Sequence, residues 1–300
     1  MNPELSTFFT DPPHWRWLIV LYFFFGGLAG GCYFLAALID LFSGPEDDPL
    51  ARLGYYIAFP LVALCGLILT IDLGRPLRFW HMLIERNTLG LMFKPWSPMS
   101  VGSWALMIFG VFAFVSFILA LADDNRLPAA AARRVTVPRA LRRVVAIIGG
   151  FFGFYVAGYT GVLLAVTNRP IWSDTPLLGM LFIVSAASTS AALMILLAHR
   201  YGWITPGLAR LDRMDNWMIV LELLVLIAVM VSLGPVLRAW LNAWGALLIV
   251  GVIIIGLLLP LALSWRPGWL WRPGRVTPAV LVLIGGFLLR VVVVLSSESV

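Results

Sequence analysis

A few polar side chains lie within or beside long apolar stretches of this 300-residue chain, and they are the residues that could do chemistry. Asp72 and Arg75 are three residues apart at the end of one stretch, a spacing at which side chains on a helical turn can form an ion pair. The same two groups could instead border a cavity and hold or exchange a proton there, because ionisable groups at membrane depth often mark functional sites. We carry both interpretations forward.

Two tyrosines are the next candidates. Tyr159 lies eight or nine residues before the end of its apolar stretch, which places it about 12 Å below the helix end at 1.5 Å per residue. That depth exceeds the position of an interfacial aromatic belt, and a buried phenol needs a hydrogen-bond partner. Tyr22 lies near the start of the first stretch. A belt explains the tryptophans at span ends, namely Trp15, Trp17, Trp96 and Trp172.

Glycines lie close to both tyrosines in the sequence. The segment GGLAGG, residues 26–31, places glycines four apart, and Gly153, Gly158 and Gly161 repeat the theme near Tyr159. Glycines at this spacing let helix backbones approach closely. The same openness near Gly27 and Gly30 would leave room for a flat ring against the backbone.

Composition identifies the medium that surrounds these residues. The chain is 61% hydrophobic and 12% charged, far more apolar than soluble domains. Runs of about 20 apolar residues predict membrane-spanning helices, and no alternating pattern favours a barrel. We therefore predict an all-α integral membrane protein, one transmembrane domain over residues 1–300, with eight helices in two packed four-helix bundles. The predicted spans are 17–42, 54–73, 99–122, 144–167, 176–199, 216–236, 242–264 and 276–296.

The distribution of arginines predicts the orientation. Eight spans leave both termini on one face, and the connections on the other face hold most of the basic residues, six of them in the stretch RLPAAAARRVTVPRALRR. The positive-inside rule places that face in the cytoplasm. We expect a bacterial cytoplasmic membrane with both termini and the 74–98 loop on the periplasmic side. The first 13 residues lack Lys and Arg, so we expect no removable signal.

Redox centres have no evident ligands in the sequence. The three histidines, His14, His81 and His199, fall at span ends, and His199 is on the face opposite the other two, so a bis-histidine haem has no pair. Cys32 and Cys65 lie inside spans without CxxC spacing, which favours buried, inert thiols over metal or disulfide roles. Any electrons must come from a partner, and the membrane offers quinone as donor or acceptor.

Four segments together resemble one family. HWRWLIVLYFFFGGLAGG in span 1, DLGRPLRFW closing span 2, KPWSPMSVGSW entering span 3 and GYTGVLLAVTNRPIW closing span 4 are similar to the NrfD-like family, the membrane subunits of polysulfide reductase and related molybdenum enzymes. The motifs cover roughly residues 14–190 and the span count covers the whole chain.

The resemblance implies an eight-helix, cofactor-free subunit that binds quinone, either menaquinone or ubiquinone. Its implied partners are a ferredoxin-like iron–sulfur subunit on the non-cytoplasmic face and a molybdopterin catalytic subunit. Tyr159 matches the family tyrosine that contacts a quinone carbonyl, and Tyr22 stands where the polysulfide-reductase version has histidine. Arg169, in the span 4 motif, joins the candidate binding residues.

Proton translocation is a further hypothesis, carried by the remaining deep ionisable residues Asp40, Glu222 and Arg290. Glu222 could instead pair with a neighbouring arginine or reach the membrane interface. Two alternatives stay open. The chain could be a small-solute transporter, for which midplane sites and internal repeats are expected, or a passive tether for soluble subunits.

Overall fold

The computed structural model describes residues 15–86, 89–126, 128, 137–202, 205–265 and 276–297. These residues form helices and no strand beyond one isolated bridge between Ile84 and Leu91. The elements are α1 (Trp17–Phe42), η2 (Pro45–Asp47), α2 (Asp48–Asp72), η3 (Pro76–Met82), α3 (Pro98–Asp123), α5 (Arg139–Ala165), α6 (Leu178–Arg200), α7 (Pro206–Leu233), η4 (Gly234–Trp240), α8 (Ala243–Leu247), η5 (Leu248–Leu258), α9 (Leu259–Trp265) and α10 (Val276–Ser296).

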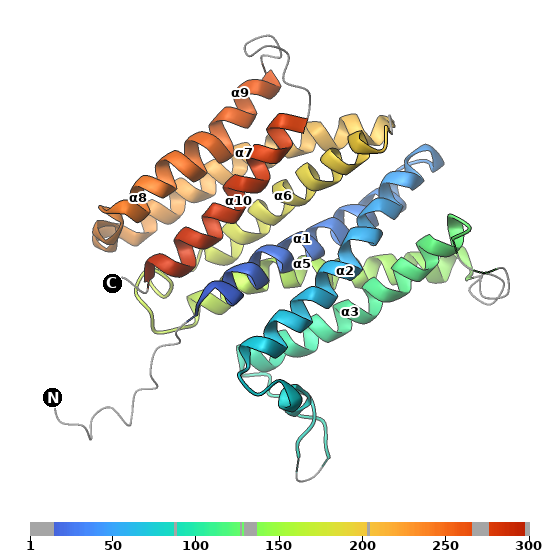
Figure 1. Cartoon of the computed structure of the whole chain (residues 1–300), viewed down its shortest axis with the longest axis horizontal. Helices are drawn as coiled ribbons and strands as arrows, with labels where there is room; N and C mark the ends of the chain where they lie inside the picture. Colours follow the sequence, from blue (N-terminus) through green and yellow to red (C-terminus); the bar gives the residue numbers. More distant parts are fainter. Residues whose placement is uncertain are drawn as a thin grey trace.

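Eight of the described helical segments are long and apolar enough to cross a membrane, with α8, η5 and α9 forming one of them. The prediction of an eight-span, all-α membrane protein is confirmed. Contacts divide the spans into two groups of four (Figure 1): α1, α2, α3 and α5 pack together, and α6, α7, α10 and the α8–η5–α9 span form the second group. Helices α1 and α5 both contact α6 and so join the groups.

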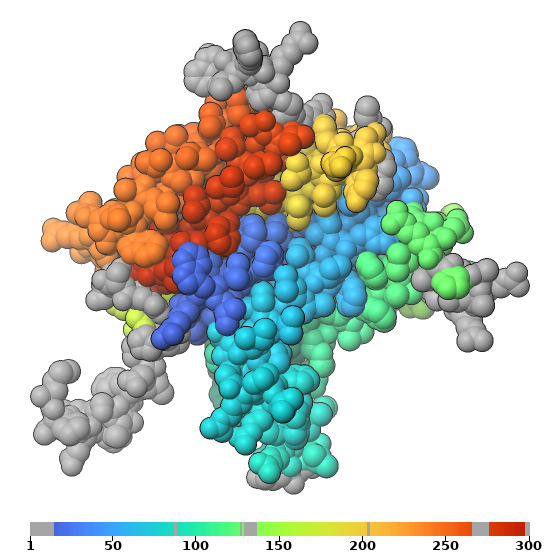
Figure 2. Space-filling model, viewed as in Figure 1, coloured from blue at the N-terminus to red at the C-terminus, as the bar shows by residue number. Residues whose placement is uncertain are grey.

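The start of α1 and the end of α10 lie at the same end of the molecule, which we call the near end; the opposite end is the far end (Figure 1). The connection between α2 and α3, residues 73–97, contains η3 and is called the η3 segment. Its described residues project from the near end, beside α2 and α3 (Figure 2). It therefore lies outside the packed helices while touching their ends.

Helices α2, α5 and α7 begin five to ten residues before their predicted spans, and the extension is longest in α2 and α7. Helix α2 starts at Asp48 with Pro49 in its first turn, and α7 starts at Pro206, capped by the Thr205 hydroxyl, which accepts from the Leu208 amide at 3.3 Å. Both extensions run through polar sequence at the far end. Hydropathy marks only the segment that crosses lipid, whereas helical hydrogen bonds continue through polar turns.

Glycines set the approach of α1 to its neighbours, as predicted. A side chain at Gly30 would collide with the Gly153 backbone of α5, and one at Gly31 would meet the Ala186 carbonyl of α6 at 2.8 Å. Such positions tolerate no Cβ, which is the packing that small residues permit in membranes. Helix α1 can thus pack closely between α5 of its own group and α6 of the other.

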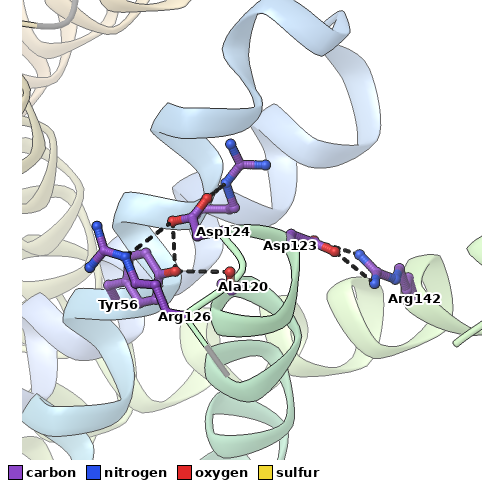
Figure 3. Close-up of polar contacts among 7 residues, drawn as sticks. Tyr56, Ala120, Asp123, Asp124, Arg126 and Arg142 are labelled. Atoms are coloured by element: carbon purple, nitrogen blue, oxygen red, sulfur yellow. Dashed lines mark hydrogen bonds and ion pairs between the residues drawn. The ribbon is translucent and has the colours of Figure 1, made fainter. Parts of the chain in front are cut away.

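Polar contacts tie the far end together (Figure 3). The Arg142 guanidinium of α5 makes two bonds of 2.6 and 2.9 Å to the Asp123 carboxylate at the end of α3. On α2, the Tyr56 hydroxyl lies 2.7 Å from the Asp124 carboxylate, which also pairs with Arg52 at 2.8 Å. These contacts hold the far ends of α2, α3 and α5 together.

A buried carboxylate joins the two groups at the same end. The Asp47 side chain, fully buried, accepts a 2.7 Å bond from the Gly207 amide in the first turn of α7 and pairs with Arg210. Because the first amides of a helix lack intrahelical partners, an acceptor from another segment satisfies one of them.

Candidate functional site

A cavity of about 720 Å³ lies between α1, α2, α3 and α5 and the η3 segment, toward the near end. Helix α1 and the residues before it contribute Tyr22 and Trp15, and α5 contributes Tyr159. Its walls are mainly aliphatic and aromatic. A concave, mostly apolar site with a few convergent polar groups is the usual form of a small-molecule site.

Five polar side chains line this cavity: Tyr22, Thr70, Asp72, Ser103 and Tyr159. Two of them are turned back into their own helices, since the Thr70 hydroxyl donates to the Gly66 carbonyl at 2.7 Å and the Ser103 hydroxyl donates to the Met99 carbonyl at 2.8 Å. The lining groups that are not bonded within their own helix are therefore two phenols and one carboxylate.

The Tyr159 hydroxyl donates to the Pro98 carbonyl at the start of α3, 2.7 Å away. Its ring stacks on Tyr155 at 5.9 Å and lies against Gly102, where any side chain would collide with it. The proton of this hydroxyl is committed to Pro98, so its oxygen is free only to accept a further hydrogen bond. The sequence predicted a hydrogen-bond partner for this buried phenol, and that partner is the Pro98 carbonyl.

The Tyr22 hydroxyl differs from that of Tyr159 in its hydrogen bonding. The side chain is 4% exposed and lines the cavity, and within the described part of the chain its hydroxyl makes no hydrogen bond. A buried phenol ordinarily has a partner. This hydroxyl can donate a hydrogen bond to a group that enters the cavity.

Asp72 and Arg75 are not paired. Asp72 is the last residue of α2 and lines the cavity, whereas Arg75 is exposed and outside the lining. No ion pair joins them among the described residues. The three-residue spacing does not bring the two side chains together, because the helix ends at Asp72 and Gly74 takes a left-handed conformation with φ of 66°. Asp72 is left as a carboxylate at the rim.

The remaining predicted site residues lie away from this cavity. A Cβ on Gly27 would lie 3.3 Å from Ala186 and from the Arg290 guanidinium, and Gly30 faces α5. Arg169 is buried and donates to the Ser297 carbonyl at 3.4 Å, near the end of α10. The structure therefore brings together Tyr22, Asp72 and Tyr159, and not the two glycines or the two arginines.

The belt interpretation is wrong for two of the four tryptophans. Trp172 is fully buried and its indole donates to the Val293 carbonyl of α10 at 2.7 Å, and Trp15 stacks on it at 5.2 Å. Trp17 and Trp96 are exposed. A tryptophan can be taken into the core when its N–H finds an acceptor there.

Comparison with known proteins adds the family. The family described as "Polysulphide reductase, NrfD" matches residues 5–300. The chain belongs to the NrfD family. It is 31% identical to one of the chains of polysulfide reductase from Wolinella succinogenes, over 83% of this chain and 82% of that protein. It is 27% identical to "Protein NrfD" of Escherichia coli, over 96% of this chain and 94% of that protein. It is 25% identical to a selenate reductase subunit of Mesobacillus selenatarsenatis, over 64% of this chain and 50% of that subunit.

This NrfD-family chain also holds a buried polar cluster in the second group of helices. The Arg290 guanidinium of α10 is fully buried and donates to the Ser185 hydroxyl and the Gly286 carbonyl, both at 2.7 Å. The buried Glu222 of α7 lies close enough to Ser185 and to Arg290 for both side chains to affect its charge. Among the described residues no ion pair joins Arg290 and Glu222 directly.

Asp215 extends this cluster toward the far end, and the sequence analysis missed it. Its buried carboxylate accepts from the Ser188 hydroxyl at 2.8 Å, and it lines a second cavity of about 230 Å³ together with Asp212 and Ser264. The signal was available, because Asp215 precedes Glu222 by seven residues, two helical turns on one face. Asp40, the third residue predicted for proton movement, lies in α1 and accepts from Tyr55 at 3.1 Å, away from this cluster.

The described histidines and cysteines of this family member lie apart from one another. In the described residues no three His, Cys, Asp or Glu side chains converge. Cys32 and Cys65 are buried free thiols, as predicted. His81 lies in η3, and the His199 ring bonds to the Ile195 carbonyl at the end of α6. His14 falls outside the described residues.

Proposed function

We propose that this protein is the quinone-reactive membrane subunit of a multi-subunit oxidoreductase, in which two electrons pass between quinone and an iron–sulfur partner while two protons are exchanged between the ring and solvent. The observation that carries the proposal is the near-end cavity, whose apolar walls surround a second tyrosine oxygen, a carboxylate and a tyrosine hydroxyl that has no partner among the described residues. A prenylated ring needs this combination: apolar volume, and a hydrogen-bonding group for each ring oxygen.

Tyr22, Tyr159 and Asp72 can serve both the oxidised ligand, quinone, and the reduced ligand, quinol. The Tyr22 hydroxyl donates to a carbonyl oxygen, and a donor there stabilises negative charge that develops during reduction. The Tyr159 oxygen, whose own proton is bound to Pro98, accepts from a ring hydroxyl of the reduced form. Asp72 stands at the rim, where a carboxylate can take or return a proton within reach of solvent.

The quinone supplies the two-electron chemistry, and the electrons enter or leave through a partner chain. Two of the similar proteins are named as one component of a reductase, and we extend that role to this chain, with an iron–sulfur subunit and a molybdopterin subunit as partners. The η3 segment suits a docking role, because Phe79 and Met82 line the cavity while Leu77 and Trp96 are 89% and 79% exposed. A subunit bound there would lie beside the ring.

We place the near end on the periplasmic side of a bacterial cytoplasmic membrane. The support is the arginine-rich set of far-end connections and the positive-inside rule.

Quinone content tests the proposal directly. Lipid extraction of the purified protein should return close to one quinone per chain. Ser103→Trp should lower that content, because the indole would fill the polar end of the cavity, whereas Leu224→Trp, on a surface-exposed position of α7, should leave it unchanged. A wild-type protein without bound quinone, and without quinol turnover in its complex, would favour the passive tether. Flux of a solute without any redox partner would favour the transporter.

We further propose that the Arg290–Ser185–Glu222 and Ser188–Asp215 contacts carry protons across the second group of helices. Ionisable groups this deep in a membrane are expensive to keep unless they have a function, and Asp215 reaches a cavity at the far end. Glu222→Gln keeps the shape and removes the titratable group. In vesicles it should lower the ratio of protons moved to electrons transferred, and an unchanged ratio would exclude Glu222 from any proton route.

A further inference from the structure

The near-end cavity has two parts with different walls. Helices α1 and α5 line only its polar part, through Tyr22 and Tyr159 among others, whereas α2 and α3 continue beyond them. On α2 the lining runs from Leu73 back to Phe59, and on α3 from Met99 to Phe114. At 1.5 Å per residue these stripes are about 21 Å and 22 Å long, so the cavity extends well into a hydrocarbon core about 30 Å thick.

The inner part of the cavity is apolar throughout. Its described lining on α2 and α3 carries no hydroxyl, amide or charge, and it consists of Phe59, Val62, Ala63 and Gly66 on α2 and Leu106, Met107, Gly110, Val111 and Phe114 on α3. The polar groups all lie nearer the ends of the helices. A ligand that fills both parts must therefore be an amphiphile with a polar head and a long hydrocarbon chain.

Two glycines keep this inner part open. A Cβ added to Gly66 or to Gly110 would meet no atom within 4 Å, in contrast to Gly30 and Gly153, where it would meet the neighbouring helix. Gly66 and Gly110 are therefore not needed for helix packing. Glycine within a helix is unfavourable by about 1 kcal/mol relative to alanine, and here the missing side chains leave space along the groove.

The inner part also opens sideways. Val111, Phe114 and Met107 line it, yet they are 56%, 47% and 39% exposed. At this depth of a spanning helix the exposed surface faces lipid. The groove between α2 and α3 thus leads from the polar end of the cavity to the hydrocarbon of the bilayer.

We propose that the groove between α2 and α3, at Gly66 and Gly110, binds the prenyl tail of the quinone and is the route by which the ring enters from the membrane. This inference rests on the proposed function and adds a specificity: the site selects quinones with a tail of several isoprene units over tail-free analogues of the same ring.

The test is to fill the groove and compare ligands that differ only in the tail. Gly66→Leu and Gly110→Leu are made in the full-length protein, with Leu67→Phe as the control, because Leu67 is 57% exposed on the same helix and does not line the cavity. Binding is measured for a long-tailed quinone and for the same ring bearing a methyl group. Each leucine should weaken binding of the long-tailed quinone about tenfold, as overfilling a packed site does, and should change binding of the methyl analogue less than about twofold.

Each outcome bears on the proposal. Equal losses for both ligands, or undiminished long-tail binding in both leucine variants, would overturn the tail groove. If wild type binds neither ligand, the proposed function fails instead. If the leucine variants do not fold, Gly66→Ala and Gly110→Ala replace them, since the added methyl meets nothing. These variants should fold normally and show a smaller loss confined to the long-tailed quinone, and no such selective loss would overturn the groove.

Discussion

Replacing Tyr22 by phenylalanine separates a ligand-binding hydroxyl from a structural one. The hydroxyl makes no hydrogen bond within the described protein, so its removal leaves no protein group unsatisfied and thermal stability should stay at the wild-type value. Binding of quinone in the ground state loses one neutral hydrogen bond, about 0.5–1.5 kcal/mol, or roughly two- to tenfold in Kd. The rate should fall further, by about a hundredfold in kcat/KM, because a donor aimed at developing charge contributes more in the transition state.

The assay is quinol turnover by the complete complex, together with thermal unfolding of the same preparation. Tyr33→Phe is the matched control: the Tyr33 hydroxyl is bonded to the Ser116 hydroxyl at 2.7 Å, is fully buried and does not line the cavity. That variant should lose about 1 kcal/mol of stability and keep its turnover. Turnover within twofold of wild type for Tyr22→Phe, or a clear loss of stability, would refute the assignment of its hydroxyl to the ligand.

Further predictions concern the second tyrosine and the packing that holds the site. Tyr159→Phe removes the bond to Pro98 and should lower both stability, by about 1 kcal/mol, and quinol turnover; normal turnover would remove Tyr159 from the mechanism. Asp47→Ala leaves the Gly207 amide without its acceptor and should destabilise the protein by about 2–3 kcal/mol in thermal or denaturant unfolding, whereas Asp48→Ala, on the neighbouring residue, should cost less than half as much. Gly30→Leu should prevent accumulation of folded protein, because α1 and α5 cannot separate to admit the side chain; a stable, quinone-loaded variant would contradict the packing described.

The sequence was sufficient for the fold class because the membrane constrains it so strongly. Helix is the structure that satisfies the backbone of long apolar runs in lipid, so eight runs predicted eight spans. The small-residue spacing also predicted close packing of α1, which the contact of Gly30 with Gly153 confirms. The burial of Cys32 and Cys65 followed from the same runs.

The tertiary structure alone decided which polar residues share a site. Spacing along one helix allowed either an Asp72–Arg75 ion pair or two groups at a cavity, and the turn at Gly74 separates the two side chains so that only Asp72 lines the cavity. The position of Trp172 at a span end predicted an interfacial residue, but its indole N–H donates to the Val293 carbonyl of α10, more than a hundred residues away in sequence. Tyr22, Asp72 and Tyr159 meet because three helices converge, and Arg290 reaches Ser185 from another span. Hydrophobicity is a property of each segment and can be read locally, whereas a cavity and its hydrogen bonds depend on how segments distant in sequence are rotated against one another.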